Sequence, residues 1–339
     1  MASQKNTIKV ALVGTGRIGN AHLRNCLGNP RVQLAYVVDV DDKQVAHWKA
    51  QLGNSVKFVT NLDEVLQDAS VDAVIICTPT ATHRDIIVKS VRAKKAVMCE
   101  KPISLNIDEI DECYKEAKEN GVPLLCGYQR RSDPSFVKLQ ENCKSGQIGT
   151  LQIMKTISRD NPVPSVAYLK ISGGIFHDCG SHDIDLCRWI LNEDPIEVFA
   201  FASAFRPEIK EIGDYDTILI TMRYASGALA SIDLSRKAAY GYDQRIEVLG
   251  DKGMVQANNK QPTTFTLCNE GGITTDPFCY SFPQRYEHAY AMELDHFVDV
   301  VLHGTTPRLS HEDVRKVAIV ANAAEESART GKKVALKWD

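Results

Sequence analysis

The sequence lacks the features that mark several specialised classes of protein. None of its ten cysteines forms a Cys-x-x-Cys pair, which disfavours a zinc ribbon or a thioredoxin-type redox centre. No apolar run approaches the roughly 18 residues of a membrane span, and the first seven residues do not resemble a signal peptide. We therefore expect a soluble, unsecreted, cytoplasmic protein that does not bind membranes.

An excess of charge of one sign is also absent. The 40 Lys and Arg residues nearly balance the 43 Asp and Glu residues, the formal net charge is −3, and neither sign forms a long block. A small molecule is therefore expected as the partner, and a nucleic acid is not. The cysteines are scattered through apolar runs such as 74–77 and 96–99, so we expect reduced core residues and no bound metal.

The first part of the chain does contain a regular alternation of short, apolar, β-rich runs with amphipathic segments. Expected strands lie at residues 8–13, 33–38, 73–77, 95–99 and 123–127. Near-continuous apolar strands are typical of a parallel sheet that helices cover on both faces. With right-handed crossovers, residues 1–127 are predicted to form an α/β, doubly wound parallel sheet of the Rossmann type. The 339 residues are long enough for a second domain.

Residues 128–339 show a different pattern. Expected strands follow one another directly at 198–204, 217–224, 228–234, 245–249 and 253–257, and helices are expected near 286–303 and 310–329. Direct succession predicts an α+β domain with a large, open, mostly antiparallel sheet. Two or three helices are too few to cover both faces of that sheet, so one face is expected to pack against another subunit in a homo-oligomer.

A glycine motif follows the first expected strand. Gly14, Gly16 and Gly19 have the G-x-G-x-x-G spacing. The first glycine allows a tight turn, the second lets backbone N–H groups approach a pyrophosphate, and the third lets the next helix pack closely. Asp39, twenty residues beyond Gly19, would hold ribose hydroxyls and repel a 2′-phosphate. NAD is therefore the expected cofactor and NADP is less favoured, although Arg17 could attract a phosphate.

Lys101 is the first candidate for chemistry outside that motif. It follows Glu100 at the end of an expected strand and precedes Pro102, whose ring stiffens the backbone. Ligands of such sheets bind beyond the carboxyl ends of the strands, where a nicotinamide would lie. Lys101 is thus a candidate catalytic residue, with an ordinary surface lysine as the alternative.

Asp178 and His182 form the second candidate. At i and i+4 of an expected helix they would share a face, and a carboxylate at that spacing can orient an imidazole as a general base. A helix N-terminus whose acids favour the dipole is the plainer alternative. A metal site that adds His177 and Asp183 is disfavoured, because no further His or Cys clusters with them.

Three further segments carry polar residues that suit a polyhydroxylated substrate. Gln129-Arg130-Arg131, residues 158–162 and Tyr240 offer amides, guanidinium groups and hydroxyls. Paired arginines also occur as solvated or interdomain ion pairs, and a tyrosine here is equally suited to sheet packing. The sequence leaves both alternatives open.

Together these segments resemble the Gfo/Idh/MocA oxidoreductase family, and the similarity covers nearly the whole chain. The segments that carry it are GTGRIG with Asp39, CTPTATH at 77–83, Glu100-Lys101-Pro102, SRDNP at 158–162, SGGIFHDCGSHDIDLCRW at 172–189, YGYD at 240–243 and EESARTGKKV at 325–334. Within the family, SRD-P followed by SGGIF-D---HDID is similar to the inositol 2-dehydrogenase group.

The resemblance implies NAD-dependent oxidation of a secondary hydroxyl group of a cyclic polyol. The expected reaction converts myo-inositol to 2-keto-myo-inositol (scyllo-inosose) by hydride transfer to nicotinamide, in a homotetramer. A dehydrogenase for a related inositol isomer or a pyranose sugar is one alternative. A non-catalytic dinucleotide-sensing regulator is another, and the joint presence of Lys101, Asp178 and His182 argues against it.

The resemblance also implies roles for individual residues. The catalytic positions are Lys101, Asp178 and His182. The cofactor-binding positions are Gly14, Gly16, Arg17, Ile18, Gly19, Asp39, Thr78, Pro79, His83 and Glu100. The substrate-binding positions are Lys101, Gln129, Arg130 or Arg131, Ser158, Asn161, Asp178, His182 and Tyr240. Ser158 departs from the histidine that inositol dehydrogenases of the family can have there.

Overall fold

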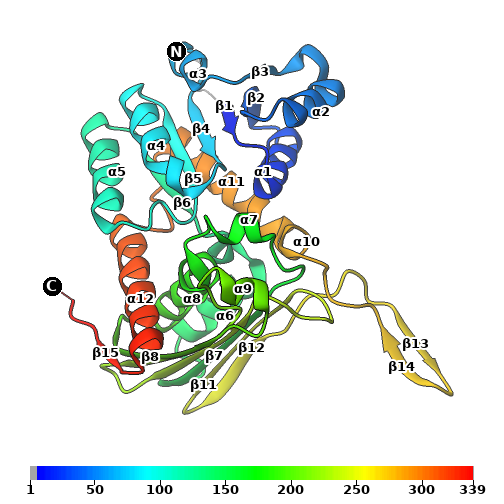
Figure 1. Cartoon of the computed structure of the whole chain (residues 1–339), viewed down its shortest axis with the longest axis vertical. Coiled ribbons are helices and arrows are strands. Elements are labelled where there is room, and N and C mark those ends of the chain that lie inside the picture. Colours follow the sequence, from blue (N-terminus) through cyan, green and yellow to red (C-terminus); the bar gives the residue numbers. More distant parts are fainter. Residues whose placement is uncertain (1–5, 339) are drawn as a thin grey trace. The chain divides into compact units, whose positions relative to one another are not determined.

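The computed structural model describes residues 6–338, which fold into two compact units (Figure 1). Unit 1 contains the chain up to Ser132 and the segment His288–Arg315, whereas unit 2 contains Asp133–Glu287 and the chain from Lys316 onward. The expected boundary after residue 127 thus lies a few residues before the observed one. The segment 288–315, expected in the second domain, belongs to unit 1.

Unit 1 is built on a parallel sheet of six strands. The strands are β1 (Ile8–Val13), β2 (Val32–Val38), β3 (Lys57–Val59), β4 (Ala73–Ile76), β5 (Ala96–Glu100) and β6 (Leu124–Gly127). Their order is β3-β2-β1-β4-β5-β6, and every neighbouring pair is parallel. The strand order reverses between β1 and β4, which makes that point the topological switch. The predicted Rossmann-type sheet is confirmed, with β3 as a strand that was not expected.

Helices connect the strands of unit 1. They are α1 (Arg17–Gly28), α2 (Asp42–Leu52), α3 (Leu62–Gln67), α4 (His83–Arg92), α5 (Ile107–Asn120) and α11 (Glu287–His303), with 3₁₀ turns η1 (Gly53–Ser55), η2 (Thr80–Thr82) and η3 (Gln129–Ser132). Asp41, Asn61 and Asn106 cap α2, α3 and α5 by accepting the backbone N–H two residues further on. Within residues 6–338, no helix combines the length and the apolar character needed to cross a bilayer.

Helix α11 joins the core of unit 1 although it follows most of unit 2 in the chain. Its Leu294, Phe297 and Val298 are fully buried and belong to the same apolar cluster as Val10 of β1 and Ile75 of β4. An apolar helix stripe packs wherever a sheet leaves an apolar face uncovered. Periodicity predicts this helix but does not say which sheet it covers, which explains the corrected assignment of 288–315.

Unit 2 is built on a seven-stranded sheet. The strands are β7 (Leu151–Arg159), β8 (Pro195–Ser203), β9 (Thr217–Tyr224), β10 (Leu229–Ser235), β11 (Asp243–Gly250), β12 (Gly253–Ala257) and β15 (Val334–Ala335). Their order is β12-β11-β7-β10-β9-β8-β15, and the pairs are antiparallel except for the parallel pair β7–β10. The predicted mostly antiparallel sheet is confirmed. The inner strand β7 was not among the expected strands.

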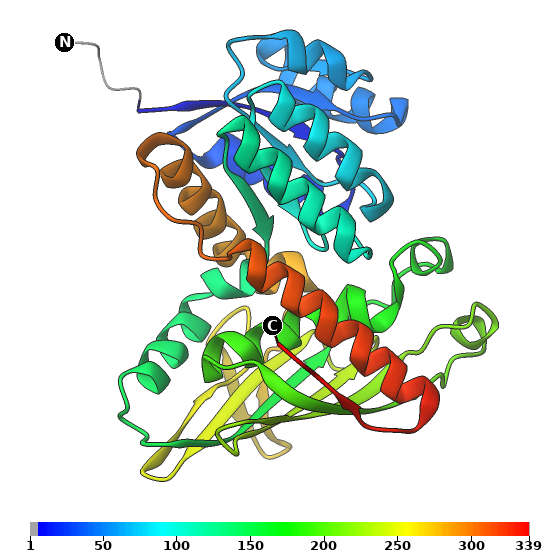
Figure 2. The same ribbon diagram turned by 90° about the vertical axis from the view of Figure 1, so that its left-hand side faces the viewer.

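Helices cover one face of this second sheet (Figure 2). They are α6 (Pro134–Lys144), α7 (Val166–Leu169), α8 (Ser181–Leu191), α9 (Pro207–Glu211), α10 (Phe282–Arg285) and the unit 2 part of α12 (His311–Thr330), with the π-helical turn η4 (Phe176–Gly180). Buried and exposed residues alternate along β9, as in a sheet with one open face. On that face Phe201 and Leu219 lie opposite each other and are 64% and 52% exposed.

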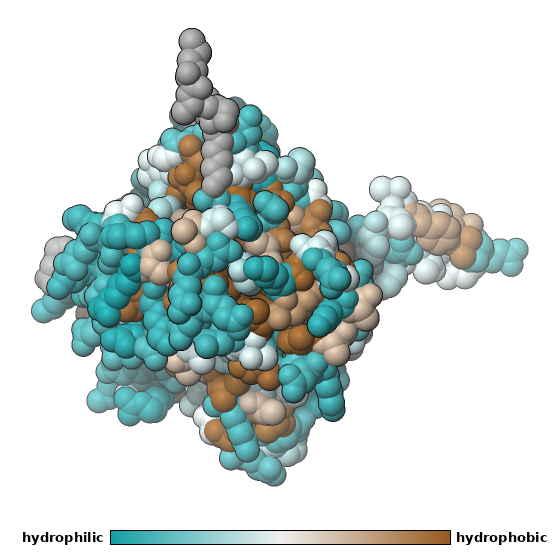
Figure 3. Space-filling view, turned by 90° about the horizontal axis from the view of Figure 1, so that it is seen from above, coloured by the Kyte–Doolittle hydropathy of each residue, from teal (hydrophilic) through white to brown (hydrophobic). Residues whose placement is uncertain are grey.

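A hairpin of β13 (Thr266–Asn269) and β14 (Gly272–Thr275) forms a separate two-stranded sheet in unit 2. Figures 1 and 3 show it as an arm that extends from the rest of this unit and carries apolar side chains. Phe265, Leu267 and Ile273 of this arm are all exposed. Exposed apolar side chains gathered on one element are typical of a surface that contacts another protein.

All ten cysteines are free thiols, and eight of them are buried. Burial raises the pKa of Cys26 and of Cys113 to about 12. These thiols therefore stay protonated at neutral pH and behave as small apolar core residues. Cys268 on the arm is the exposed exception.

Candidate active site

The cofactor-binding candidates of unit 1 lie at one edge of its sheet. Because all six strands are parallel, their carboxyl ends meet at that edge, where ligands of such sheets bind. The glycine loop follows β1, Asp39 follows β2, Thr78 and Pro79 follow β4, Lys101 follows β5 and Gln129 follows β6. The fold therefore brings together candidates that are far apart in the sequence.

The glycine loop fits a pyrophosphate. Gly14 has φ +91°, and a Cβ there would lie 2.8 Å from the carbonyl oxygen of Cys77. A Cβ at Gly19 would lie 2.1 Å from the carbonyl oxygen of Gly14, so neither position accepts a side chain. Gly16 faces open space and precedes α1 without a side-chain cap. The amino-terminal end of α1, where backbone N–H groups lack partners within the helix, is the kind of site that binds the phosphates of a dinucleotide.

Asp39 is fixed beside this loop. Its Oδ2 accepts hydrogen bonds from the backbone N–H of Thr15, at 2.7 Å, and from the Thr15 hydroxyl. Its Oδ1 accepts the backbone N–H of Asp41 at 2.9 Å. The carboxylate has further lone pairs, and an acidic residue at this position after the second strand is the one that binds ribose hydroxyls in folds of this type. Arg17 and Ile18 open α1, and Arg17 is exposed.

His83 holds two of the loops at this edge. It is 1% exposed, and its Nε2 and Nδ1 lie 2.8 Å from the carbonyl oxygens of Thr78 and Pro102, respectively. Burial lowers the pKa of His83, and hydrogen bonds to the two carbonyl groups oppose that shift. His83 therefore links the loop after β4 to the loop after β5. Lys101, on the second of these loops, is half-buried.

Of the two neighbouring arginines in the turn η3, Arg131 makes contacts with the later chain segment of unit 1. Arg131 donates to the carbonyl oxygen of Arg308 at 3.0 Å and pairs with Asp313 at 3.4 Å, both within unit 1. It therefore ties η3 to the end of the chain segment that completes the unit. Gln129 and Arg130 are buried as well, and Gln129 Oε1 has no hydrogen-bond partner among residues 6–338.

In unit 2, Asp178 and His182 lie in different helical segments. Asp178 belongs to the π-helical turn η4, and His182 is the second residue of α8. A π turn is wider than an α turn, so the expected i, i+4 relation of an α-helix does not describe their spacing. Both side chains are buried, with exposed fractions of 7% and 9%.

Asp178 is anchored by groups from distant parts of unit 2. Its Oδ1 accepts the hydroxyl of Tyr168 at 2.8 Å, and its Oδ2 pairs with Arg236 at 2.9 Å. Arg236 is fully buried and also pairs with Asp214 at 3.2 Å. Burial by itself lowers the pKa of Arg236, but Cys179 and the two carboxylates raise it, so the guanidinium stays charged. The Asp178 carboxylate is thereby held in place by a hydroxyl donor and a buried cation.

Ser158, expected as a substrate contact, lies in a buried network. Its hydroxyl donates to Asp183 Oδ1 at 2.7 Å and lies 3.0 Å from Gln244 Oε1. Tyr286 donates its hydroxyl to the same Gln244 oxygen at 3.3 Å. Asp183 is fully buried in α8 next to His182. Ser158 therefore ties β7 to the start of α8, and its role as a substrate contact stays a prediction.

Asn161 and Tyr240 occupy more open positions of unit 2. Asn161 Nδ2 donates to the carbonyl oxygen of Tyr280 at 2.9 Å. Tyr240 is 47% exposed, donates its hydroxyl to Asp243 at 2.9 Å and accepts from Arg159 at 3.1 Å. An exposed ring with a fixed hydroxyl suits a polyol, so the predicted role of Tyr240 is compatible with this geometry.

Sequence reasoning missed Tyr168 and Arg236, and it considered Asp183 only as part of the disfavoured metal site. Their hydrogen-bond and ion-pair partners lie on other elements of the fold, so spacing in the local sequence does not indicate these pairs. Asp183 follows Ser181 and His182 in α8, so nothing in the local sequence distinguishes it as a buried polar residue. His177, a member of the disfavoured metal set, lies with its Nε2 3.4 Å from a carboxylate oxygen of Glu325 of α12. Among residues 6–338, metal-ligand spacing is found instead for His22, Glu100 and Glu293.

Comparison with known proteins places this geometry in a family. The model of an oxidoreductase family with an NAD-binding Rossmann fold matches residues 8–128, and the GFO/IDH/MocA C-terminal domain matches residues 136–256. The myo-inositol 2-dehydrogenase of Thermotoga maritima is 38% identical over 331 residues, which cover 97% of this chain and 99% of that protein.

Solved structures agree with these matches over the whole chain. A myo-inositol dehydrogenase from Corynebacterium glutamicum superposes with a TM-score of 0.91 at 35% identity, covering 98% of this chain and 100% of that one. The scyllo-inositol dehydrogenase from Lactobacillus casei with bound NAD(H) and scyllo-inositol gives 0.89 at 28% identity, covering 97% and 99%. With a glycine loop that fits a dinucleotide and matches over both units, the chain belongs to the Gfo/Idh/MocA family of NAD-binding oxidoreductases.

Proposed function

We propose that this protein is an NAD-dependent dehydrogenase that oxidises one secondary hydroxyl group of a cyclic polyol, with myo-inositol as the substrate. The observation that carries the proposal is the similarity to inositol dehydrogenases over 97–98% of the chain. The dinucleotide loop and the segment with Asp178 and His182 support it, because hydride transfer needs a bound cofactor and a base for the hydroxyl proton.

Each of the three candidate catalytic residues has a distinct role in this proposal. His182 accepts the proton of the hydroxyl group as the C=O bond forms. Asp178, which Arg236 and Tyr168 hold in place, stabilises the positive charge that the imidazole gains. Lys101 donates a hydrogen bond to the substrate oxygen as negative charge develops on it. Bound NAD supplies the acceptor for the hydride, which leaves the carbon with its electron pair.

The substrate contacts proposed beside them are polar groups that can bind adjacent hydroxyls. Gln129 and Arg130 follow β6, whereas Asn161 and Tyr240 lie in unit 2. The buried Gln129 Oε1 has no partner among the described residues, so it can accept a hydroxyl donor without losing a bond. Ser158 contributes through Asp183 at the start of α8.

An activity screen tests the proposed function directly. The purified protein is incubated with myo-inositol, scyllo-inositol, other isomers and pyranose sugars, and NADH formation is followed by absorbance. We expect turnover with myo-inositol at least about tenfold more efficient, by kcat/KM, than with any pyranose, because ring hydroxyls are read by fixed donors and acceptors. If the enzyme prefers scyllo-inositol or a sugar, the proposed substrate is wrong, but the proposed reaction, NAD-dependent oxidation of a hydroxyl group, stands.

The screen also separates the enzyme from a sensor. A non-catalytic dinucleotide-sensing regulator would bind NAD yet turn over none of the polyols. The natural control is NAD binding measured by calorimetry on the same preparation. Binding without turnover of any substrate would reject the dehydrogenase assignment.

Asp39 is expected to make the enzyme prefer NAD to NADP. A carboxylate facing the 2′-phosphate in a partly desolvated pocket costs a few kcal/mol, roughly a hundredfold in kcat/KM, which outweighs the attraction of the solvent-exposed Arg17. Asp39→Asn removes the charge and should shrink the ratio of the two kcat/KM values by at least about tenfold. The matched control is Asp63→Asn, an exposed aspartate of α3. Equal use of both cofactors by the unmodified enzyme would contradict this expectation.

The open face of the unit 2 sheet is expected to be buried in a homotetramer. Phe201 and Leu219 form an exposed apolar pair there, and Leu229 lies beside Ile153 on β7. Light scattering should give about four times the 37.6 kDa of one chain at micromolar concentration. Phe201→Asp with Leu219→Asp should lower that mass, whereas Glu119→Lys on α5 should not. A stable monomer of the unmodified chain would refute the tetramer.

The cytoplasm is the compartment proposed for this enzyme. Ten free thiols, eight of them buried, suit a reducing environment in which no disulfide forms. Fractionation of cells that express the tagged protein should recover it with cytosolic marker enzymes. Recovery with a membrane or extracellular fraction would count against this placement.

A further inference from the structure

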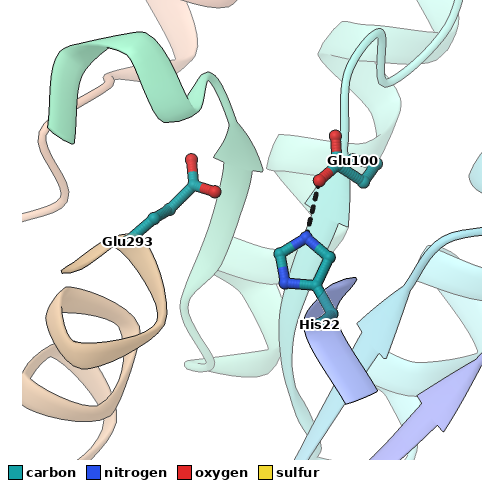
Figure 4. Close-up of side chains that lie close together, drawn as sticks. All are labelled: His22, Glu100 and Glu293. Carbon is teal, nitrogen blue, oxygen red and sulfur yellow. Dashed lines mark hydrogen bonds and ion pairs between the residues drawn. The ribbon is translucent and has the colours of Figure 1, made fainter. Parts of the chain in front are cut away.

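Three buried titratable side chains meet within unit 1. His22 lies on α1, Glu100 ends β5 and Glu293 lies on α11, and Figure 4 shows the Glu293 carboxyl group directed toward the other two. Their exposed fractions are 0%, 7% and 4%. His22 Nε2 lies 2.6 Å from Glu100 Oε1, and the ligand atoms of all three lie within 4.8 Å of one another. Groups of this kind are seldom buried without a purpose.

The charges in this cluster are compatible with burial only if one carboxyl group is neutral. Burial raises the pKa of Glu293 well above its usual value, and the negative charge of Glu100 raises it further, while Arg308 opposes the shift. This shift favours the neutral, protonated form of the Glu293 carboxyl group. Oε2 of Glu293 and Nδ1 of His22 have no hydrogen-bond partner among the described residues.

The hydrogen bond between His22 and Glu100 also argues against a metal ion. Two ligands on one tetrahedral zinc lie about 3.3 Å apart, given zinc–ligand bonds of roughly 2.0–2.1 Å. The 2.6 Å between His22 Nε2 and Glu100 Oε1 is instead the distance of a short, charge-assisted hydrogen bond. The cluster therefore holds the Glu100 side chain in one place by itself.

Glu100 is the residue immediately before Lys101, and its surroundings leave it little room. It pairs with Gly127 of β6, where an added Cβ would lie 3.3 Å from both Cα and Cδ of Glu100. On the other side of Lys101, His83 binds the carbonyl oxygen of Pro102 at 2.8 Å. Two buried histidines thus hold the segment that carries Lys101, one before the lysine and one after it.

We propose that His22 and Glu293 are positioning residues, which fix Glu100 and thereby place the Lys101 amine for its role in the reaction. His22 forms the hydrogen bond with Glu100. The Glu293 carboxyl group lies beside this pair and, in its neutral form, adds no second negative charge. A lysine has four rotatable side-chain bonds, so its amine is placed only if its backbone is fixed. A displacement of about 1 Å in a reacting group can cost roughly 10²-fold in rate. The proposal rests on the proposed dehydrogenase function.

Two substitutions of His22 with the same polarity test the hydrogen bond. In His22→Gln the side-chain amide can reach Glu100, whereas in His22→Asn it is too short. With myo-inositol and NAD, His22→Asn should lower kcat by at least about tenfold with less than about a threefold change in KM for NAD, and His22→Gln should recover most of the loss. His303→Asn, at the exposed end of α11, is the matched control and should leave kcat unchanged.

Two substitutions of Glu293 test its charge. Glu293→Gln keeps the shape of a neutral carboxyl group and should keep kcat within about threefold, whereas Glu293→Leu should lower it by at least about tenfold. A metal ligand would behave differently, because an amide does not replace a carboxylate on the metal. A stoichiometric divalent metal in the purified protein that is lost in Glu293→Gln, together with its activity, would overturn the proposal in favour of a metal site.

A measurement independent of turnover separates failure of this inference from failure of the proposed function. The reactivity of the Lys101 amine toward acetic anhydride is measured by mass spectrometry, with the exposed Lys118 of α5 as internal reference. His22→Asn and Glu293→Leu should change the ratio by at least about threefold, whereas His22→Gln and Glu293→Gln should not. If all four variants fold and neither this ratio nor kcat moves, the proposal is wrong. If the unmodified protein oxidises no polyol, the function fails while the labelling still decides the inference.

Discussion

Lys101→Met and His182→Ala are each expected to lower turnover with myo-inositol by at least about 10²-fold, the lower range for a lost general acid or base. Lys101 follows β5 of unit 1, and His182 is nearly fully buried at the start of α8 in unit 2. Neither belongs to the glycine loop or to the Asp39 network. NAD affinity, measured by calorimetry or fluorescence, should therefore change by less than about tenfold, or roughly 1.4 kcal/mol.

The controls for this experiment are residues of the same type at exposed positions. Lys118→Met on α5 and His303→Ala on α11 should both keep turnover within about twofold of the unmodified enzyme. If Lys101→Met and His182→Ala behaved like these controls with every polyol tried, the assigned catalytic residues would be wrong. The dinucleotide-sensing regulator would then become the better account of the chain.

Arg236→Met is expected to destabilise the protein by about 3–5 kcal/mol, the usual cost of removing one partner from a buried ion pair. The substitution leaves the carboxylates of Asp178 and Asp214, which Arg236 binds at 2.9 Å and 3.2 Å, without their shared cation. Urea unfolding followed by fluorescence and by circular dichroism should show the loss. Arg329→Met, at the exposed end of α12, should stay within about 0.5 kcal/mol. An equal, small effect of both substitutions would show that Arg236 does not anchor Asp178.

Asp178→Asn separates the charge of this residue from its shape. The amide oxygen can still accept from Arg236, so the stability loss should be well below that of Arg236→Met. Without the negative charge the imidazolium form of His182 is less favoured, so the base is neutral at lower pH but also weaker. The acidic limb of the pH profile of kcat/KM should therefore move to lower pH while the plateau falls. An unchanged profile would mean that Asp178 only completes the helix start.

The comparison of sequence and structure shows where local patterns suffice. Strands of mostly apolar residues such as 8–13 and the turn glycines after β1 were predicted because periodicity and backbone conformation are local properties. The three-residue strand β3 is too short and too exposed to give such a pattern. The inner strand β7 was missed although its residues do alternate between buried and exposed positions.

The residues of the candidate site also divide into those that the local sequence indicates and those that it does not. The glycine loop, Asp39, Lys101 and His182 stand in recognisable local sequences, so they could be proposed. Arg236 could not, since its two ion pairs join segments that only the folded sheet of unit 2 brings together. The π-helical turn η4 also gave no signal, because spacing in the sequence does not reveal where a helix widens.

The two-part composition of unit 1 sets an order on its folding during translation. The sheet strands leave the ribosome first, but Leu294, Phe297 and Val298 of their core emerge only after Asp133–Glu287 has been made. At about 5–20 residues per second this takes on the order of ten to thirty seconds. Throughout that interval α1 and α2 cover part of this apolar face, but the part against which α11 packs stays exposed, so this part is where we expect a chaperone to bind. A gene fragment that stops before α11 would leave the same part of the face permanently exposed.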